Sequence, residues 1–224
     1  MSASSGPAEV GEALVKVRRE IHAHPELARA EFRTTGLVAD ALARAGLTPA
    51  VLPGGVGLVC DIGEQPPTVA LRADLDALPI PDTKDVSYRS TVDGVAHACG
   101  HDVHTTVVLG AGLALAGVAA RGGLPHGVRL VFQPAEEVIP VGALDVIRAG
   151  GIDGVQRIYA VHCDPGTDIG TVALRSGPIT AASDLLEVRL SGPGGHTARP
   201  HLTVDLVAAL GTLISATPGL LARR

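Results

Sequence analysis

The sequence predicts an α/β fold in which a mixed, mostly parallel sheet is flanked by helices. Short apolar runs typical of strands alternate with helical segments along most of the chain, which is the pattern of a sheet that is at least partly parallel. Runs such as RLVF and IYAV are almost continuously apolar, which suits strands that are buried on both faces. Of the 224 residues, 46% are apolar and 18% are charged, so a globular core is expected and disorder is not.

Two helices and two strands are predicted within residues 8–74. Apolar residues recur every three or four positions over 8–23, which indicates an amphipathic helix that ends before Pro25. A second apolar-periodic segment ends at Gly46, a residue typical of a left-handed helix cap. The runs VGLVCDI (56–62) and TVALRAD (68–74) then read as strands.

Helices and strands continue to alternate after residue 100. A helix is expected from the segment HACGHD to about Ala120, and the later elements are a strand at 127–133, a helix at 142–149 capped by Gly150, and strands at 157–163 and 170–175.

The C-terminal tail has a different pattern. DLLEVRL (184–190) alternates like a half-exposed strand, SGPGGHTARPH follows, and a helix is expected from about Thr203 to Ala216. One strand and one helix cannot enclose a core. We therefore expect the tail to pack on the main domain, on another subunit, or against residues that this chain lacks.

Composition excludes several classes of protein. The net charge of -5 and the lack of a basic run argue against nucleic acid as a partner. Three cysteines are an odd number and form no disulfide framework, so a reducing compartment is expected. The N-terminus lacks the pattern of a secretory signal, and the longest apolar stretch, 105–120, contains glycines and is short for a membrane span. These features predict a soluble, cytoplasmic protein with no membrane partner.

Polar residues gather at the ends of the predicted strands. Asp74 and Asp76 end one strand, Glu136 and Glu137 follow the next, and His162 and Asp164 end another, while the segment HACGHD (97–102) opens a helix. In open α/β sheets, ligands bind outside the carboxyl ends of the strands. We expect these four segments to meet at one edge of the sheet.

Their chemistry fits a transition-metal site. Cys99 and His101 are two residues apart in a loop of small residues, so both side chains can face one ion. Thiolate, imidazole and carboxylate together favour a transition metal over Mg²⁺ or Ca²⁺. If the adjacent Glu136 and Glu137 lie in a turn, one can bind metal while the other takes a proton from water.

Each of these residues also has a purely structural interpretation. Cys99 and Cys163 can be small buried hydrophobes, and His162 can be a satisfied core histidine. Asp102 is expected to cap the following helix and not to bind metal. Glu136 and Glu137 can form a solvated helical turn, and Asp74 can pair with Arg72. His97 and His104 can either support a metal ligand from behind or be plain loop residues, and HAHPE (22–26) can be a helix end with a turn.

Ordered motifs over residues 14–210 resemble a known family. RREIHAHPELARAEFRTTGLVADAL, ALRADLDALPI, HACGHDVHTTVVLGA, FQPAEE, VHCDP and GPGGHTARPHLTVD occur in this order. Together they resemble the M20-type metallopeptidases, and among these the amidohydrolases that cleave N-acyl amino acids, hippurate-like compounds and auxin conjugates. The resemblance implies a zinc-exopeptidase-like catalytic domain over 1–180 and the beginning of a smaller α+β lid and dimerisation domain over 181–224.

The resemblance also implies roles for individual residues. It implies a site for two divalent transition-metal ions (Zn, Mn or Co) with Cys99, His101, Glu137 and His162 as ligands. Glu136 is then the general base and acid, and Asp76 the carboxylate that orients a ligand. His196 is similar to the lid histidine that reaches into the partner subunit's site, so a homodimer is implied for the complete form.

One departure from the family pattern bears on activity. The chain ends within the implied lid, before the segment that returns to the catalytic domain with a further histidine ligand. The leading hypothesis is a metal-dependent amidohydrolase of N-acyl amino acids. The alternatives are a catalytically inactive metal-binding fragment, one half of a split enzyme, and a structural zinc domain, which would close four ligands around one ion.

Overall fold

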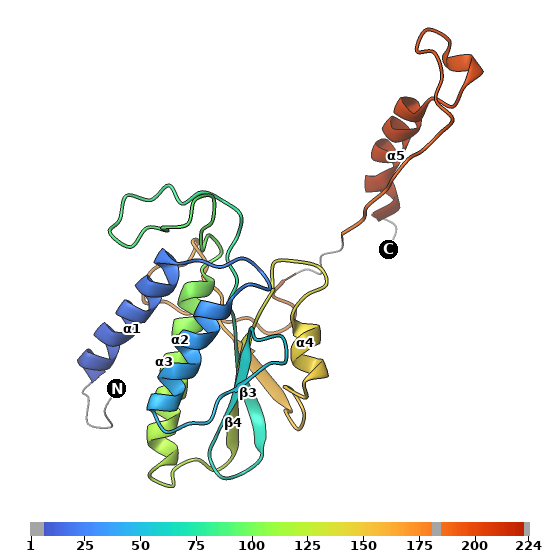
Figure 1. Ribbon diagram of the computed structural model, residues 1–224. Helices are drawn as coiled ribbons and strands as arrows, with labels where there is room; N and C mark the ends of the chain where they lie inside the picture. The colour runs from blue at the N-terminus through green and yellow to red at the C-terminus, as the bar shows by residue number, and fades with distance from the viewer. Residues whose placement is uncertain (1–6, 181–184, 222–224) are drawn as a thin grey trace. The chain divides into compact units, whose positions relative to one another are not determined.

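The computed structural model describes residues 7–180 and 185–221. The chain divides into two compact units, Met1–Ala173 and Leu174–Arg224. The first unit holds a five-stranded sheet with four helices, and the second holds a single α-helix in its described part (Figure 1).

The sheet of the first unit is mixed, as predicted. Its strand order is β1-β2-β4-β3-β5. β3 pairs in parallel with β4 and with β5, whereas β2 is antiparallel to both β1 and β4. The parallel part therefore carries the ends of β3, β4 and β5 to one edge. The strands are β1 (Ala50–Val51), β2 (Leu58–Ile62), β3 (Pro67–Asp74), β4 (Gly127–Gln133) and β5 (Arg157–Ala160).

Helices cover both faces of the sheet. One face packs against α2 and α3 through a buried apolar cluster that includes Leu42, Leu109, Leu130 and Phe132. The opposite face packs against α4 through a smaller cluster that includes Val131 and Val146, and α1 contacts α3 (Figure 1). Successive residues of β4 enter opposite clusters, as the two-residue period of a strand requires. The helices are α1 (Pro7–Ala23), α2 (Phe32–Arg44), α3 (His101–Ala119) and α4 (Ala143–Arg148).

By length and composition, α3 is apolar enough to span a membrane. In the structure it is a core helix. Residues such as His101, Val108 and Leu109 are buried, and the helix contacts β2, β3, β4, α1 and α2. Its apolar composition is explained by neighbours on several sides.

Most predicted elements lie where the sequence places them, but three strands differ, two of them between residues 157 and 175 and the third at 184–190. Residues 170–175 form no strand, and their apolar side chains are highly exposed, with Leu174 at 90%. β5 ends at Ala160 rather than at residue 163, and all four of its residues are exposed instead of buried. The reason is its place at the edge of the sheet, where β3 is its single neighbour in the described residues.

The second unit contains a 3₁₀ turn, η1 (Pro200–Leu202), and the helix α5 (Leu206–Leu221). The predicted strand at 184–190 is absent over 185–190, and residue 184 lies outside the described residues. Among the described residues of this unit, no strand pairs with this alternating segment. α5 begins later than predicted because Asp205 Oδ1 accepts the N–H of Ala208 at 2.9 Å, which is an N-cap contact.

The packing of α3 on the sheet predicts the effect of one core substitution. Leu109→Ala should lower the free energy of unfolding by roughly 2–5 kcal/mol, because it opens a cavity at a fully buried position. Urea denaturation followed by circular dichroism measures it. Val107→Ala on the same helix is the control, since Val107 is 45% exposed and should change stability by about 0.5 kcal/mol or less. Equal losses in both variants would contradict the described packing.

Candidate metal centre

The site residues come from the ends of three strands and from the start of α3. Asp74 is the last residue of β3 and Asp76 follows it, while Glu136 and Glu137 follow β4. Cys99 lies just before α3, whose first residue is His101, and His162 lies just after β5.

A left-handed glycine makes this arrangement possible. Gly100 precedes α3 with φ of 92°, a conformation that residues with a side chain rarely adopt. A Cβ atom at Gly100 would lie 3.0 Å from the Sγ of Cys163, so the chain after β5 passes close to the start of α3. The glycine therefore brings the segment of His162 next to that of Cys99 and His101.

The four residues predicted as ligands lie together. One potential ligand atom from each of Cys99, His101 and Glu137 lies within 4.8 Å of the other two. His101 Nε2 is 3.7 Å from Glu137 Oε1, and His162 Nε2 is 3.5 Å from Cys99 Sγ. The predicted base, Glu136, is adjacent, with Oε2 at 3.9 Å from His101 Nε2.

Asp76 contacts two of the predicted ligands. His101 Nδ1 lies 2.9 Å from the backbone oxygen of Asp76 and 3.3 Å from its Oδ1. Because the backbone oxygen of Asp76 accepts a hydrogen bond and its carboxylate lies close by, the proton is favoured on Nδ1, which leaves Nε2 free to bind on the side of Glu137. Asp76 Oδ2 accepts the N–H of Glu137 at 2.9 Å. These contacts are the ones that the predicted role of Asp76, orienting the predicted ligands, requires.

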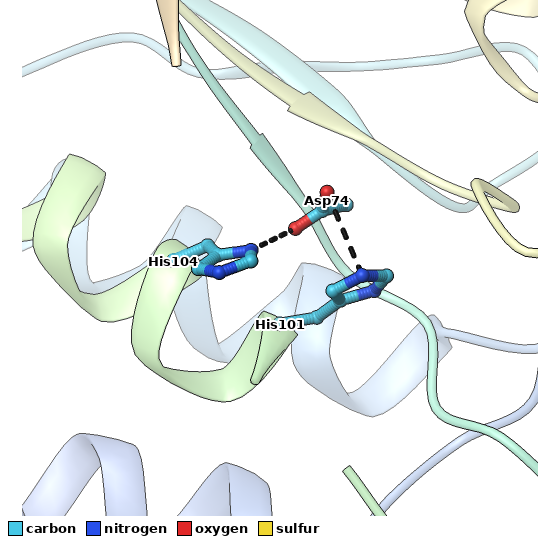
Figure 2. A group of neighbouring side chains, drawn as sticks. All are labelled: Asp74, His101 and His104. Atoms are coloured by element: carbon cyan, nitrogen blue, oxygen red, sulfur yellow. Dashed lines mark hydrogen bonds and ion pairs between the residues drawn. The ribbon is translucent and has the colours of Figure 1, made fainter. Parts of the chain in front are cut away.

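A second possible metal-binding group contains Asp74, His101 and His104 (Figure 2). Here both nitrogens of His104 are already engaged. Nδ1 donates to Asp74 Oδ1 at 2.7 Å, and Nε2 accepts the N–H of Cys163 at 2.8 Å. Asp74 Oδ2 also accepts from Arg72 at 2.8 Å. This group is therefore a satisfied hydrogen-bond chain rather than a place for an ion.

The hydrogen bonds of His104 fix the loop that carries His162, because Cys163, which donates its N–H to His104, directly follows His162. His104 is 1% exposed and its ring lies 4.9 Å from the ring of His162, centroid to centroid. From the sequence, His104 could either support a metal ligand or be a plain loop residue. Its spacing of three residues from His101 was the available signal, since residues three apart on a helix are neighbours.

The electrostatics of the site fit a cation. Burial, and next the charge of Glu137, raise the pKa of the Cys99 thiol to about 12. Burial and the charge of Glu137 also raise the pKa of Glu136. By contrast, the pKa of Asp74 falls to about 2 in spite of its burial, because it accepts from His104 and lies near His101 and Arg72. Acidic groups thus crowd the site beside His101, and a bound cation would favour their ionised forms.

Asp102 does not cap α3, contrary to the sequence-based expectation. Its carboxylate is 1% exposed and lies 2.7 Å from both His22 Nδ1 and Arg18 Nε. The reason is that the first turn of α3 is buried against α1, so this carboxylate pairs with Arg18 and His22 of α1. Asp164 also stays apart from the cluster, because its carboxylate accepts from Gly166 and Thr167 within its own turn.

His97 and His196 have different surroundings. His97 is 4% exposed, neither ring nitrogen has a partner among the described residues, and burial lowers its pKa to about 4. His196 is an exposed residue of the second unit, and its Nδ1 accepts the N–H of Ala198 at 3.1 Å.

The fold and this cluster define an α/β protein with thiol, imidazole and carboxylate groups at the strand ends. The sequence profile of peptidase family M20/M25/M40 matches residues 70–221. The chain belongs to this family, as the ordered motifs predicted.

The chain is also similar to named relatives over most of its length. The chain is 38% identical over 213 residues to the N-acetylcysteine deacetylase of Bacillus subtilis, covering 94% of this chain and 55% of that protein. It is 53% identical over 212 residues to a Rhodococcus jostii protein that carries a glutamate–cysteine ligase name, covering 94% of this chain and 26% of that protein.

A solved dinuclear metal-binding peptidase of the M20 family from Bacillus subtilis has a TM-score of 0.72 and 36% identity, over 77% of this chain and 48% of that one. The chain thus spans between about a quarter and just over half the length of the curated relatives described above.

The geometry predicts which cysteine binds metal. Cys99→Ala should weaken Co²⁺ binding by more than the roughly 10–100-fold lost when a residue behind a ligand is changed, because it removes a ligand. Titration of the purified protein with Co²⁺, followed by absorption spectroscopy, measures the change. Cys163→Ala is the matched control, because the backbone N–H that contacts His104 is retained. Equal Co²⁺ affinities in the two variants would exclude Cys99 as a ligand.

Proposed function

We propose that this protein is a metal-dependent amidohydrolase that cleaves the amide bond of N-acyl amino acids or similar small amides. The observation that carries the proposal is the cluster of Cys99, His101 and Glu137 with the carboxylate of Glu136 beside it. The membership of the chain in peptidase family M20/M25/M40 and its likeness to an N-acetylcysteine deacetylase support this class of substrate.

The proposed cofactors are two divalent transition-metal ions, Zn, Mn or Co, held by Cys99, His101, Glu137 and His162. When bound, such ions polarise the carbonyl of the substrate and make water more acidic. Thiolate and imidazole ligands favour these metals over Mg²⁺ or Ca²⁺, and the named dinuclear relative supports the number of ions.

Glu136 is the proposed general base and acid. Its side chain is 40% exposed, so it can reach water and substrate, while Glu137 is less exposed and lies nearer to His101. Glu136 accepts a proton from the attacking water and returns it to the departing nitrogen. Its raised pKa suits this exchange because a carboxylate of higher pKa is a stronger base. Asp76 keeps His101 and Glu137 oriented during the reaction.

Residues 1–180 are proposed as the catalytic domain and 181–224 as the beginning of a lid and dimerisation domain. We place the protein in the cytoplasm and propose a homodimer for the complete enzyme. The second candidate function is a metal-binding fragment without activity, or one half of a split enzyme. We keep this candidate because the chain covers 55% of the length of the N-acetylcysteine deacetylase.

Activity assays separate the two candidates. Metal content and hydrolysis of a panel of N-acyl amino acids should be measured for this chain and for a longer chain that includes the family's returning segment. We expect weak metal binding and little hydrolysis by the 224 residues alone. Turnover and metal loading equal to those of the longer chain would contradict this expectation.

Glu136→Gln should lower kcat by about 10²–10⁴-fold in the active form, because the amide cannot take the proton from water. Metal content, measured by atomic emission, should remain nearly unchanged. Glu137→Gln is the matched neighbour and should lower metal content itself. Near-normal turnover of the Glu136→Gln variant would remove Glu136 as the base.

His196 is proposed to act in the site of the neighbouring subunit. If sites are shared, mixing inactive His196→Ala and inactive Glu136→Gln proteins should restore part of the activity, because the mixed dimer contains one intact site. The control is each variant assayed alone at the same total concentration. Mixed dimers that form, as shown by mass spectrometry, yet stay inactive would count against a shared site.

A further inference from the structure

Glu31 is a fully buried glutamate that none of the proposed roles uses. It directly precedes α2 and is 0% exposed. Its Oε1 accepts the backbone N–H of Ala135 at 2.7 Å, across a sequence separation of 104 residues. Its other oxygen, Oε2, has no hydrogen-bond partner among the described residues. Keeping a carboxyl group buried and half satisfied is unfavourable, so its contact with Ala135 calls for an explanation.

Ala135 has an unusual backbone conformation. Its φ is +51°, in the left-handed region that residues other than glycine rarely adopt. Its N–H donates to Glu31, and its carbonyl accepts the N–H of Gly142 at 2.8 Å. Gly142 has no room for a side chain, since a Cβ atom would lie 1.9 Å from the oxygen of Pro134. The strained turn therefore persists because both peptide groups of Ala135 are held.

This turn determines where the next two residues point. Ala135 directly precedes Glu136 and Glu137, and the N–H of Glu137 donates to Asp76 Oδ2. Two buried carboxyl groups from distant segments therefore hold the turn, Glu31 before Glu136 and Asp76 after it. The Glu136 side chain is 40% exposed, so little packing fixes it and its direction depends on the backbone.

We propose that Glu31 is a positioning residue that holds Glu136 and Glu137 toward His101 by accepting the N–H of Ala135. Its effect on catalysis rests on the proposed function, whereas its effect on the turn and on metal binding does not. The acceptor oxygen matters and the negative charge does not. Burial raises the pKa of the Glu31 carboxyl, which agrees with a role that needs no charge.

The test compares substitutions that keep or remove the acceptor. Glu31→Gln keeps an oxygen at the same place, and Glu31→Met has similar length without an acceptor. In Glu31→Met we expect the Ala135 amide to exchange with deuterium about tenfold faster, as NMR measures. Co²⁺ affinity should fall by roughly 10–100-fold, and kcat in the active form should fall more than KM changes. Glu31→Gln should match the unaltered protein in all three. Glu31→Asp, which draws the oxygen back, should give smaller changes of the same sign if Glu31→Met does not fold.

A second substitution separates positioning from stability. Ala135→Gly relieves the left-handed strain, so adding it to Glu31→Met should recover stability in urea. Co²⁺ affinity should stay low, because the turn is still not held. Recovery of that affinity in the double variant would overturn the proposal, and so would normal Ala135 exchange and Co²⁺ affinity in Glu31→Met. If no form hydrolyses amides but exchange and Co²⁺ affinity respond to Met and not to Gln, the proposed function fails and the positioning role stands.

Discussion

The hydrogen bonds of His104 are the constraint on which the candidate site depends. Asp74 at the end of β3 accepts from one ring nitrogen, and the other accepts the N–H of Cys163 after β5. One buried imidazole thus ties a strand end, the first turn of α3 and the loop of His162 together. In a low-dielectric interior such a fully satisfied chain is strong, and losing one member would leave the others unpaired. The position of His162 beside Cys99 follows from it.

Charge is distributed unevenly around the hydrogen bonds of His104. Asp74 is buried, but it accepts a hydrogen bond from His104 and lies near His101 and Arg72, and its pKa falls to about 2. Burial and the nearby carboxylate of Glu137 raise the pKa values of Cys99 and Glu136. The site therefore has two parts. Around Asp74 the carboxylate has hydrogen-bond and ion-pair partners, whereas around Cys99 and Glu136 acidic groups lie close together. A cation is expected in the second part because the first has no free ligand atoms on His104.

The sequence predicted those features of the fold and site that repeat locally. Short apolar runs located β3 and β4, and polar residues after the strands located Asp76, Glu136, Glu137 and His162. It did not predict the partners of His104 or the left-handed turn at Ala135, because each depends on a residue tens of positions away. Alanine in particular gives no signal for positive φ. IYAV was expected to be buried because the run is almost continuously apolar, but apolarity does not report the number of neighbouring strands, and β5 lies at the edge.

A second buried network holds the segment between β3 and α3. His22 of α1 lies between two aspartates, with Nδ1 at 2.7 Å from Asp102 and Nε2 at 3.2 Å from Asp82. Asp82 also accepts the N–H groups of Lys84 and Ser90. These contacts tie the irregular segment between β3 and α3 to both α1 and α3. Cys99 lies at the end of that segment, so its place depends on them. The irregular backbone around the proposed ligands is therefore fixed by buried polar contacts where regular secondary structure is absent.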